Sequence, residues 1–472
     1  MKAIKNNRIK FSISAILIIM GFQVNTLMNQ DKGFGKSRWQ THNVITWDVR
    51  EYYAYLPAIF HYKNPAFTFL DTMKGQDKAN LDCGKSPIGK YVCRFSIGMA
   101  IAYAPFYLIA DQVARFEGIS RDGFSEPYQF GLYISGFIYS VIGFIFLTLV
   151  LRRFFSDGIT AITLLCIGLG TNLFYYTTSE GAMTHATLFC LCAIMLYFTV
   201  LWHQEQKMKY FIGFSVFFGF AVLIRPTEMI AGFVFLLYGV TGRKGLIQKL
   251  NMLIKHWKQI LVALVILFLI ALPQMIYWKQ QTGSYLYYSY HGENFFFQHP
   301  RIFKGLFSYR KGWFLYTPMM LIAVAGFIFL RKYASELFVP ILVFLVLNIY
   351  VVLSWWCWWY GGSFGLRAFI DSYAFLSVPL ASFWAMAFKE GGIVRVTLLL
   401  IAGFLCYLNL FQSRQYREGM LHYDSMSKEL YWAAFLKYGY VKDKDNMNDV
   451  PNYKAAMQGL PETTPIDTSK AH

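Results

Sequence analysis

The assignment of the fold begins with residues 46–57, which read TWDVREYYAYLP. The stretch follows shortly after the first hydrophobic segment and contains two carboxylates, an arginine and three tyrosines. Residues three and four positions apart share one face of a helix, so Asp48, Glu51, Tyr52 and Tyr55 are expected to lie together. Two interpretations follow. One is an acid/base pair with aromatic walls at a membrane surface, and the other is an interfacial helix whose tyrosines anchor it among the headgroups.

The composition is that of a polytopic membrane protein. Of 472 residues, 56% are hydrophobic and only 15% are charged. Apolar runs of about 18–20 residues recur, and segments that span a bilayer must satisfy their own backbone hydrogen bonds, which predicts an all-α protein. The net charge of +18 does not indicate nucleic-acid binding, because the basic residues lie mostly in short loops between apolar runs. There they set the topology and meet anionic lipid.

The positive residues predict the topology. An uncleaved first helix (11–28) follows a basic N-terminus, and residues 29–127 form a large exterior first loop. The apolar run 95–110 is predicted to lie in the membrane interface, although a twelfth span at this run stays open. Every predicted interior loop is then basic, and we expect about eleven transmembrane helices. The other ten are 128–151, 159–176, 184–202, 210–224, 229–240, 260–278, 313–330, 337–355, 368–388 and 396–410.

The domain organisation follows from these spans. Residues 1–410 are expected to form one transmembrane domain. Residues 411–472 are expected to form a polar exterior tail, with an interfacial helix at 431–436 and a disordered end.

The cysteines bear on the compartment and on metal binding. Cys83 and Cys93 are the only cysteines in a predicted exterior loop, and they could close a short disulfide if that compartment is oxidising. The other five lie in apolar segments, where cysteine usually serves packing. No Cys/His spacing indicates a metal site, so we assign no metal ligand. The sequence specifies no cofactor and leaves a divalent metal ion open.

Two further motifs carry candidate ligand-binding residues. Residues 354–367 read SWWCWWYGGSFGLR. The tryptophans, Trp359 included, fit an aromatic belt, whereas glycines such as Gly362 let a backbone approach a ligand, and Arg367 at the start of the next helix suits a phosphate. Arg225 precedes Pro226 between two short spans, and broken helices beside a charge commonly line a cavity. Arg225 could also snorkel or pair with Glu228.

The remaining candidates have weaker patterns. His185 is expected to open a helix on the exterior side, where a lone histidine is more often structural. His291 lies in an aromatic loop that could stack on a sugar or lie at headgroup depth. Lys85 and Lys90 precede the interfacial run. They could bind the phosphate of a donor lipid, or attract lipid phosphates non-specifically as lysines beside an interfacial helix do. Tyr52 and Tyr53 stay undecided between sugar stacking and anchoring.

These motifs together resemble the GT-C superfamily of membrane glycosyltransferases, and within it bacterial relatives of the protein O-mannosyltransferases and lipid A aminoarabinose transferases. The residues that carry the resemblance are Asp48 with Tyr52-Tyr53, the segment 90–105, Arg225-Pro226-Thr227-Glu228, and the run from Trp359 to Arg367. The sequence departs from the usual pair of acidic residues, because Asp48-Val49-Arg50-Glu51 stands in its place.

The resemblance implies sugar transfer from a polyprenyl-phosphate-linked donor to a glycan, lipid or protein acceptor of the cell envelope. The protein would be a multi-pass protein of the bacterial inner membrane with its active site facing the periplasm. A hydroxyl acceptor must lose a proton as the new bond forms, which suits Asp48 as general base, assisted by Glu51. A phosphate leaving group needs cations, which suits Arg225, Arg367, Lys85 and Lys90. The proposed substrate contacts are Tyr52, Tyr53, His185, His291, Trp359 and Gly362.

Other classes of protein stay open. A transporter or flippase could use the same charged cavity without chemistry, although the sequence has no internal repeat of the kind common in transporters. A membrane acyltransferase has only a thin basis in His185 and Glu180. A non-catalytic protein of envelope polysaccharide assembly is a further alternative.

Overall fold

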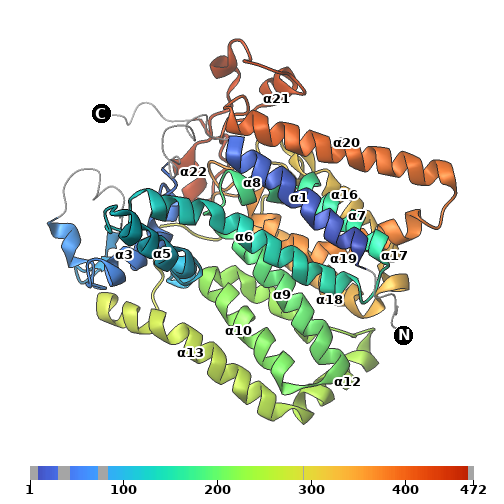
Figure 1. The fold of residues 1–472 in the computed structure, drawn as a ribbon, viewed down its shortest axis with the longest axis horizontal. Helices are drawn as coiled ribbons and strands as arrows, with labels where there is room; N and C mark the ends of the chain where they lie inside the picture. Colours follow the sequence, from blue (N-terminus) through green and yellow to red (C-terminus); the bar gives the residue numbers. More distant parts are fainter. Residues whose placement is uncertain (1–8, 30–42, 73–82, 291, 466–472) are drawn as a thin grey trace. The chain divides into compact units, whose positions relative to one another are not determined.

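The computed structural model describes residues 9–29, 43–72, 83–290 and 292–465. Within these ranges the chain is helical apart from loops, one small hairpin and an isolated bridge. Two compact units are present. Unit 1 comprises residues 1–15, 151–175 and 290–472, and unit 2 comprises residues 16–150 and 176–289. Figure 1 shows the elements of both.

Unit 2 contains most of the earlier helices and several short elements. Its longer helices are α1 (Lys10–Asn29, shared with unit 1), α5 (Gly98–Glu117), α6 (Glu126–Leu151), α9 (Thr184–Glu205), α10 (Met208–Ile224), α12 (Arg243–Lys255) and α13 (Trp257–Thr282). Its short elements are α2 (Asp48–Tyr53), α3 (Tyr55–Phe60), η1 (Thr68–Asp71), β1 (Gly84–Lys85), β2 (Tyr91–Val92), η2 (Pro226–Ala231) and α11 (Gly232–Leu236).

Helix α9 is the most buried of the apolar helices in unit 2, and α10 packs between it and α13 (Figure 1). Helix α10 ends where the sequence predicts a break. Arg225 is extended, with φ −142° and ψ 112°, and the 3₁₀ turn η2 begins at Pro226. A proline ring disfavours helical backbone at the residue before it, which explains the extended Arg225.

Unit 1 contains the later helices. They are α7 (Asp157–Gly170), α8 (Leu173–Thr178, shared with unit 2), α14 (Ile302–Phe307), α15 (Trp313–Tyr316), α16 (Met319–Ala325), α17 (Phe327–Tyr333), η3 (Ser335–Leu337), α18 (Phe338–Val352), η4 (Arg367–Ser372), α19 (Tyr373–Ala387), α20 (Gly392–Arg417), α21 (Lys428–Ala434), η5 (Lys444–Met447) and α22 (Tyr453–Met457).

Helix α19 is the most buried apolar helix of unit 1 and contacts α7, α16 and α17. A glycine permits one of these contacts. A Cβ atom on Gly326 would lie 1.9 Å from the carbonyl oxygen of Pro379 in α19, so only a residue without a side chain fits there. Small residues at such crossings are typical of membrane helix packing.

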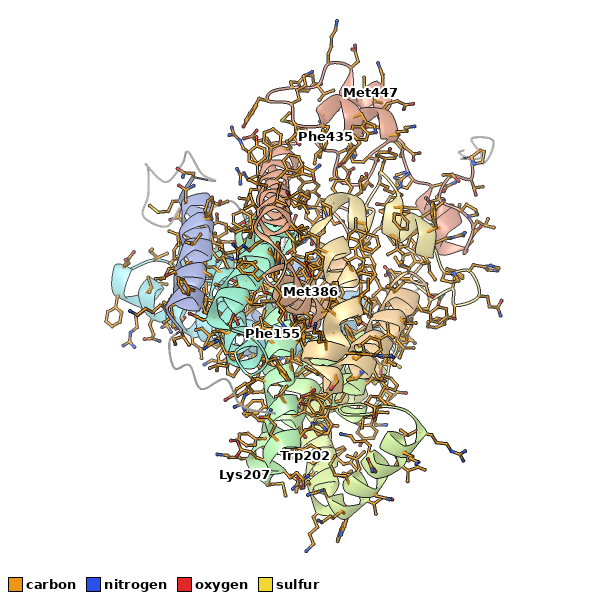
Figure 2. All side chains as sticks on the ribbon, turned by 90° about the vertical axis from the view of Figure 1, so that its right-hand side faces the viewer. Phe155, Trp202, Lys207, Met386, Phe435 and Met447 are labelled. Atoms are coloured by element: carbon orange, nitrogen blue, oxygen red, sulfur yellow. A yellow bond between two sulfur atoms is a disulfide. The ribbon has the colours of Figure 1, made fainter. Side chains whose placement is uncertain are left out.

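The C-terminal segment is part of unit 1 rather than separate from it. In Figure 2, Phe435 and Met447 of this segment lie together at one end of the unit, beyond Met386 and Phe155. Helix α21 covers most of the interfacial helix expected at 431–436. Residues 466–472, where the sequence analysis expects disorder, lie outside the described residues.

Seven described helices are long and apolar enough to cross a membrane, and three shorter apolar helices accompany them. The protein is therefore a multi-pass, all-α membrane protein, as expected, but the count of eleven spans is not confirmed. Helix α5, which contains most of the apolar run 95–110 expected in the interface, is not among the seven. The expected span 313–330 is divided among α15, α16 and α17.

Candidate functional site

Asp48 occupies the first position of α2, and its side chain is half-buried. Trp47 directly before it has φ 48° and is 82% exposed, so the chain turns sharply into the helix. Backbone N–H groups at a helix start favour a carboxylate there. Asp48 also lies near Tyr103 of α5. Burial above all, and then Tyr139 and the Asp48 carboxylate, raise the pKa of Tyr103.

The tyrosines that follow Asp48 fix α2 and α3 against the rest of unit 2. The Tyr53 hydroxyl donates to the carbonyl of Gly123, and the ring of Tyr52 stacks on Phe95 with centroids 4.1 Å apart. The Tyr55 hydroxyl donates to the Phe95 carbonyl at 2.7 Å. Burial raises the pKa of Tyr53 and Tyr55, which keeps both as neutral donors. The sugar contact expected of Tyr52 and Tyr53 stays a prediction, and both side chains are buried against protein.

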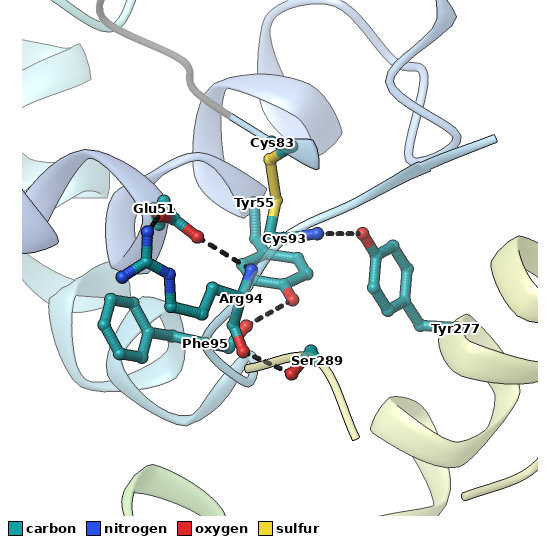
Figure 3. The surroundings of a disulfide bond; sticks show 8 residues. All are labelled: Glu51, Tyr55, Cys83, Cys93, Arg94, Phe95, Tyr277 and Ser289. Atoms are coloured by element: carbon teal, nitrogen blue, oxygen red, sulfur yellow. Dashed lines mark hydrogen bonds and ion pairs between the residues drawn. A yellow bond between two sulfur atoms is a disulfide. The ribbon is translucent and has the colours of Figure 1, made fainter. Parts of the chain in front are cut away.

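Glu51 forms a pair that the sequence analysis missed (Figure 3). Its Oε2 accepts the backbone N–H of Arg94 at 2.7 Å, and its Oε1 lies 3.3 Å from Nη2 of the same arginine. Glu51 is buried, whereas the Arg94 side chain is 42% exposed. Both carboxylate oxygens of Glu51 thus contact one residue 43 positions later in the chain. The only sequence signal for Arg94 is its place between Cys93 and the apolar run.

A disulfide joins Cys83 to Cys93, which confirms the pairing left open by the sequence (Figure 3). The loop that it closes contains the β1–β2 hairpin, in which Lys85 pairs with Tyr91. The hairpin is bonded to α13: the Ser86 hydroxyl donates to the Gln281 carbonyl, and the Cys93 N–H donates to the Tyr277 hydroxyl. The disulfide therefore fixes the segment that holds Glu51.

Both candidate lysines of this loop have protein partners. Lys85 Nζ lies 3.6 Å from Asp71 and 4.0 Å from the centre of the Tyr91 ring. Lys90 Nζ donates to the Gln280 carbonyl at 3.0 Å. Both lysines are exposed, and their binding of a donor phosphate stays a prediction.

A chain of contacts leads from α2 to Arg225. After Arg94 and Phe95, the Ser96 hydroxyl donates to the Leu223 carbonyl at the end of α10. A Cβ atom on Gly98 would lie 2.7 Å from the Ile224 nitrogen, so this glycine lets the start of α5 meet the backbone next to Arg225. The helix that begins with Asp48 and the helix break at Arg225 are thus connected within unit 2.

Arg225 and His185 form the second part of the site. Arg225 Nη2 donates to Thr184 Oγ1 at 2.8 Å and lies 3.5 Å from His185 Nδ1, while Nη1 lies 4.0 Å from Glu228 Oε1. His185 is buried and packs edge-to-face on Tyr176 at 4.8 Å. The pairing with Glu228, which the sequence left open as an alternative for Arg225, is present, and Thr184 is a partner that the sequence did not reveal.

The other predicted residues lie in unit 1. Trp359 is buried, with its indole N–H 3.4 Å from the Tyr453 hydroxyl. Gly362 is exposed. Arg367 is half-buried at the start of η4, and its backbone N–H donates to the Gly365 carbonyl at 3.1 Å. His291 lies outside the described residues. Because unit 1 and unit 2 are separate bodies, the roles assigned to Trp359, Gly362 and Arg367 stay predictions.

No metal centre is evident in the described ranges, where three or more His, Cys, Asp or Glu side chains do not gather at one point.

Comparison with known proteins identifies the fold. Residues 124–278 match the family model of the dolichyl-phosphate-mannose-protein mannosyltransferases. The crystal structure of the apo oligosaccharyltransferase of Archaeoglobus fulgidus is similar over 96% of this chain, with a TM-score of 0.50 and 12% sequence identity. Both matches are to glycosyltransferases by name, and both support the resemblance to the GT-C superfamily. No curated protein sequence matches it.

The structural match confirms the all-α membrane fold class, and the family match over part of the chain supports the resemblance. The chain spans 60% of the length of the archaeal oligosaccharyltransferase. At 12% identity that likeness shows the fold and not the substrates. The family-model match runs from just before α6 into α13, and it includes Arg225 and His185 but not Asp48.

Proposed function

We propose that this protein is a membrane glycosyltransferase of the GT-C type that moves a sugar from a polyprenyl-phosphate-linked donor to a hydroxyl of an envelope acceptor. The reaction takes place on the periplasmic face of a bacterial inner membrane. The observation that carries the proposal is the chain of contacts in unit 2 that ties the Asp48 helix to Arg225. The transfer requires a carboxylate to accept the proton and a cation to stabilise the leaving phosphate, and unit 2 contains both.

The chemistry divides between these two residues. The acceptor oxygen attacks C1 of the donor sugar, the bond from C1 to the phosphate oxygen breaks, and the acceptor proton passes to the Asp48 carboxylate. The polyprenyl phosphate leaves with the bonding electrons and gains negative charge. Arg225, fixed through Thr184 at 2.8 Å, stabilises that charge.

Glu51 has a different task from Asp48 in this mechanism. Its oxygens contact Arg94, so it positions the loop instead of taking the acceptor proton. His185 contacts the Arg225 guanidinium and orients it. Arg367, in unit 1, stays a candidate for donor binding.

The test uses the purified chain in vesicles with a polyprenyl-phosphate sugar and an acceptor extract, with transfer followed by mass spectrometry of the products. Asp48→Asn should lower the rate about 10²–10⁴-fold, which is the usual contribution of a general base. Full transfer by this variant would remove Asp48 from the mechanism. Movement of donor lipid between leaflets without any glycosylated product would establish a flippase instead.

A further inference from the structure

Helix α12 (Arg243–Lys255) lies apart from the residues of the candidate site. It is neither one of the seven candidate spans nor one of the three shorter apolar helices. Helix α13, which is a candidate span, begins directly after it at Trp257. Little of α13 is buried inside the protein, so most of its apolar side chains face lipid. Helix α12 therefore lies where the chain enters the bilayer.

Helix α12 lies at the opposite end of α9 from Arg225 (Figure 1). Lys249 of α12 is buried, and its ammonium group contacts Nε2 of His203 near the end of α9. Arg225, in contrast, contacts His185 in the first turn of the same helix. His185 and His203 are 18 positions apart, which corresponds to roughly 27 Å along a helix. The hydrocarbon core of a bilayer is about 30 Å thick, so the two ends of α9 lie near opposite boundaries of the membrane.

The contacts of Lys249 decide which sides of α12 are exposed. The ammonium group lies 5.3 Å from the centre of the Phe235 ring and 5.6 Å from that of the Trp202 ring, so this side of the helix faces the rest of unit 2. Successive residues are about 100° apart around a helix, which leaves two further flanks. One flank contains the exposed apolar side chains Leu246, Ile247, Leu250 and Ile254. The other flank contains the exposed polar side chains Lys244, Gln248, Asn251 and Lys255.

The exposed charge on and beside α12 is entirely positive. Arg243 at its start and Lys258 just beyond its end are exposed, as are Lys244 and Lys255 on the polar flank. The sequence from 229 to 292 contains no aspartate or glutamate. In the described part of the chain, none of these four basic side chains forms an ion pair with a carboxylate. Their charge is therefore available to an anionic partner.

A lipid bilayer fits both exposed flanks. Ile254 on the apolar flank is 68% exposed, and Trp257 and Leu261 at the start of α13 are 56% and 49% exposed. Apolar exposure thus continues from α12 into a helix that faces lipid. A helix that is too short and too polar to span, with one apolar and one basic flank, is typical of helices that lie in the plane of an anionic membrane surface.

We propose that α12 is an in-plane helix that binds an anionic phospholipid leaflet. Leu250 and Ile254 lie among the acyl chains at the membrane boundary, and Lys244 and Lys255 contact lipid phosphates. Lys249, on the remaining side, attaches the helix to α9. This lipid binding does not depend on the proposed glycosyl transfer.

The orientation of α12 is tested by nitroxide labels at Leu250→Cys and, as the matched control on the opposite flank, at Gln248→Cys. The full-length protein is placed in vesicles that contain phosphatidylglycerol, and collisions of each label with oxygen and with a water-soluble nickel chelate are measured by electron paramagnetic resonance. Wild-type protein taken through the same labelling gives the background from native cysteines. Oxygen should collide more often at 250 and the nickel chelate more often at 248. Equal collision ratios at the two positions would overturn the in-plane orientation.

The preference for anionic lipid is tested by titrating the full-length protein in detergent with phosphatidylglycerol or phosphatidylcholine of the same acyl chains, and counting bound lipids by native mass spectrometry. Phosphatidylglycerol should bind about fivefold or more tightly, roughly the contribution of one basic side chain at an anionic surface. The double variant Lys244→Gln/Lys255→Gln should lose about fivefold or more of that preference. The control Lys442→Gln/Lys454→Gln removes two exposed lysines of unit 1 and should keep it. Equal affinity of the wild type for both lipids, or an equal loss in the two double variants, would contradict the proposal.

Discussion

Glu51 and Asp48 lie three residues apart, and we assign positioning to Glu51 and catalysis to Asp48. Replacing each carboxylate by its amide tests this division of roles. Glu51→Gln keeps an oxygen that can accept the Arg94 N–H but removes the negative charge. Asp48→Asn removes the proposed base at the start of α2 and leaves the Glu51 contacts intact. The two variants should therefore affect different quantities.

The structure gives the size of the Glu51 effect. The hydrogen bond from the Arg94 N–H to a charged oxygen at 2.7 Å contributes about 1.5–3 kcal/mol, of which a neutral acceptor keeps about half. The ion pair at 3.3 Å adds about 0–1 kcal/mol, because the Arg94 side chain is 42% exposed. Glu51→Gln should then lower the free energy of unfolding by roughly 1–2 kcal/mol, and Glu51→Ala by roughly 2–4 kcal/mol.

The assay measures both quantities on each variant: thermal unfolding in detergent, and the transfer rate in vesicles below the unfolding temperature. Glu51→Gln should unfold at a lower temperature and keep kcat within about threefold of wild type, since it changes no reacting group. Asp48→Asn should keep its stability within about 1 kcal/mol and lose about 10²–10⁴-fold in rate. A Glu51→Gln protein with unchanged stability and a rate as low as that of Asp48→Asn would refute the division of roles.

Three further perturbations follow from the structure. Replacing Cys83 and Cys93 by serine should lower the free energy of unfolding by about 2.5–3 kcal/mol, as expected for a loop of this length; a reductant should then lower the Tm of the wild type but not of the double variant. Burial lowers the pKa of Lys249 to about 7, whereas a lysine in an unfolded chain has a pKa of about 10.4. Between pH 7 and about 10 the unfolded state therefore binds more protons than the folded state, so the free energy of unfolding should rise with pH across that window. Lys249→Met should flatten that rise in Tm, and an unchanged slope would contradict the burial argument. Gly365→Ala should destabilise the protein by at least about 1–2 kcal/mol, because Gly365 has φ +60° and its Cβ would lie 3.0 Å from the Cβ of Tyr316; Gly391→Ala, which meets nothing within 4 Å, should show no such loss in the same unfolding measurement.

The sequence predicts the features that depend on local patterns. Apolar runs long enough to cross a bilayer must be helical, so hydropathy alone leads to a multi-pass all-α protein. Proline restricts the residue before it, so the break at Arg225 is readable from the sequence. The pair Cys83 and Cys93 is also readable, because no other cysteines share their predicted loop.

Only the tertiary structure decided which distant partners the site residues contact. Glu51 resembles a catalytic partner of Asp48 on a helical face, yet its contacts are with Arg94, which no local periodicity connects to it. The sequence predicts a polar exterior tail from residue 411 but not its partners, which include Arg301 and Lys304 of the same unit. Periodicity reports which face of a helix is apolar, but ion pairs and hydrogen bonds over 40 to 160 positions arise only when the chain is folded.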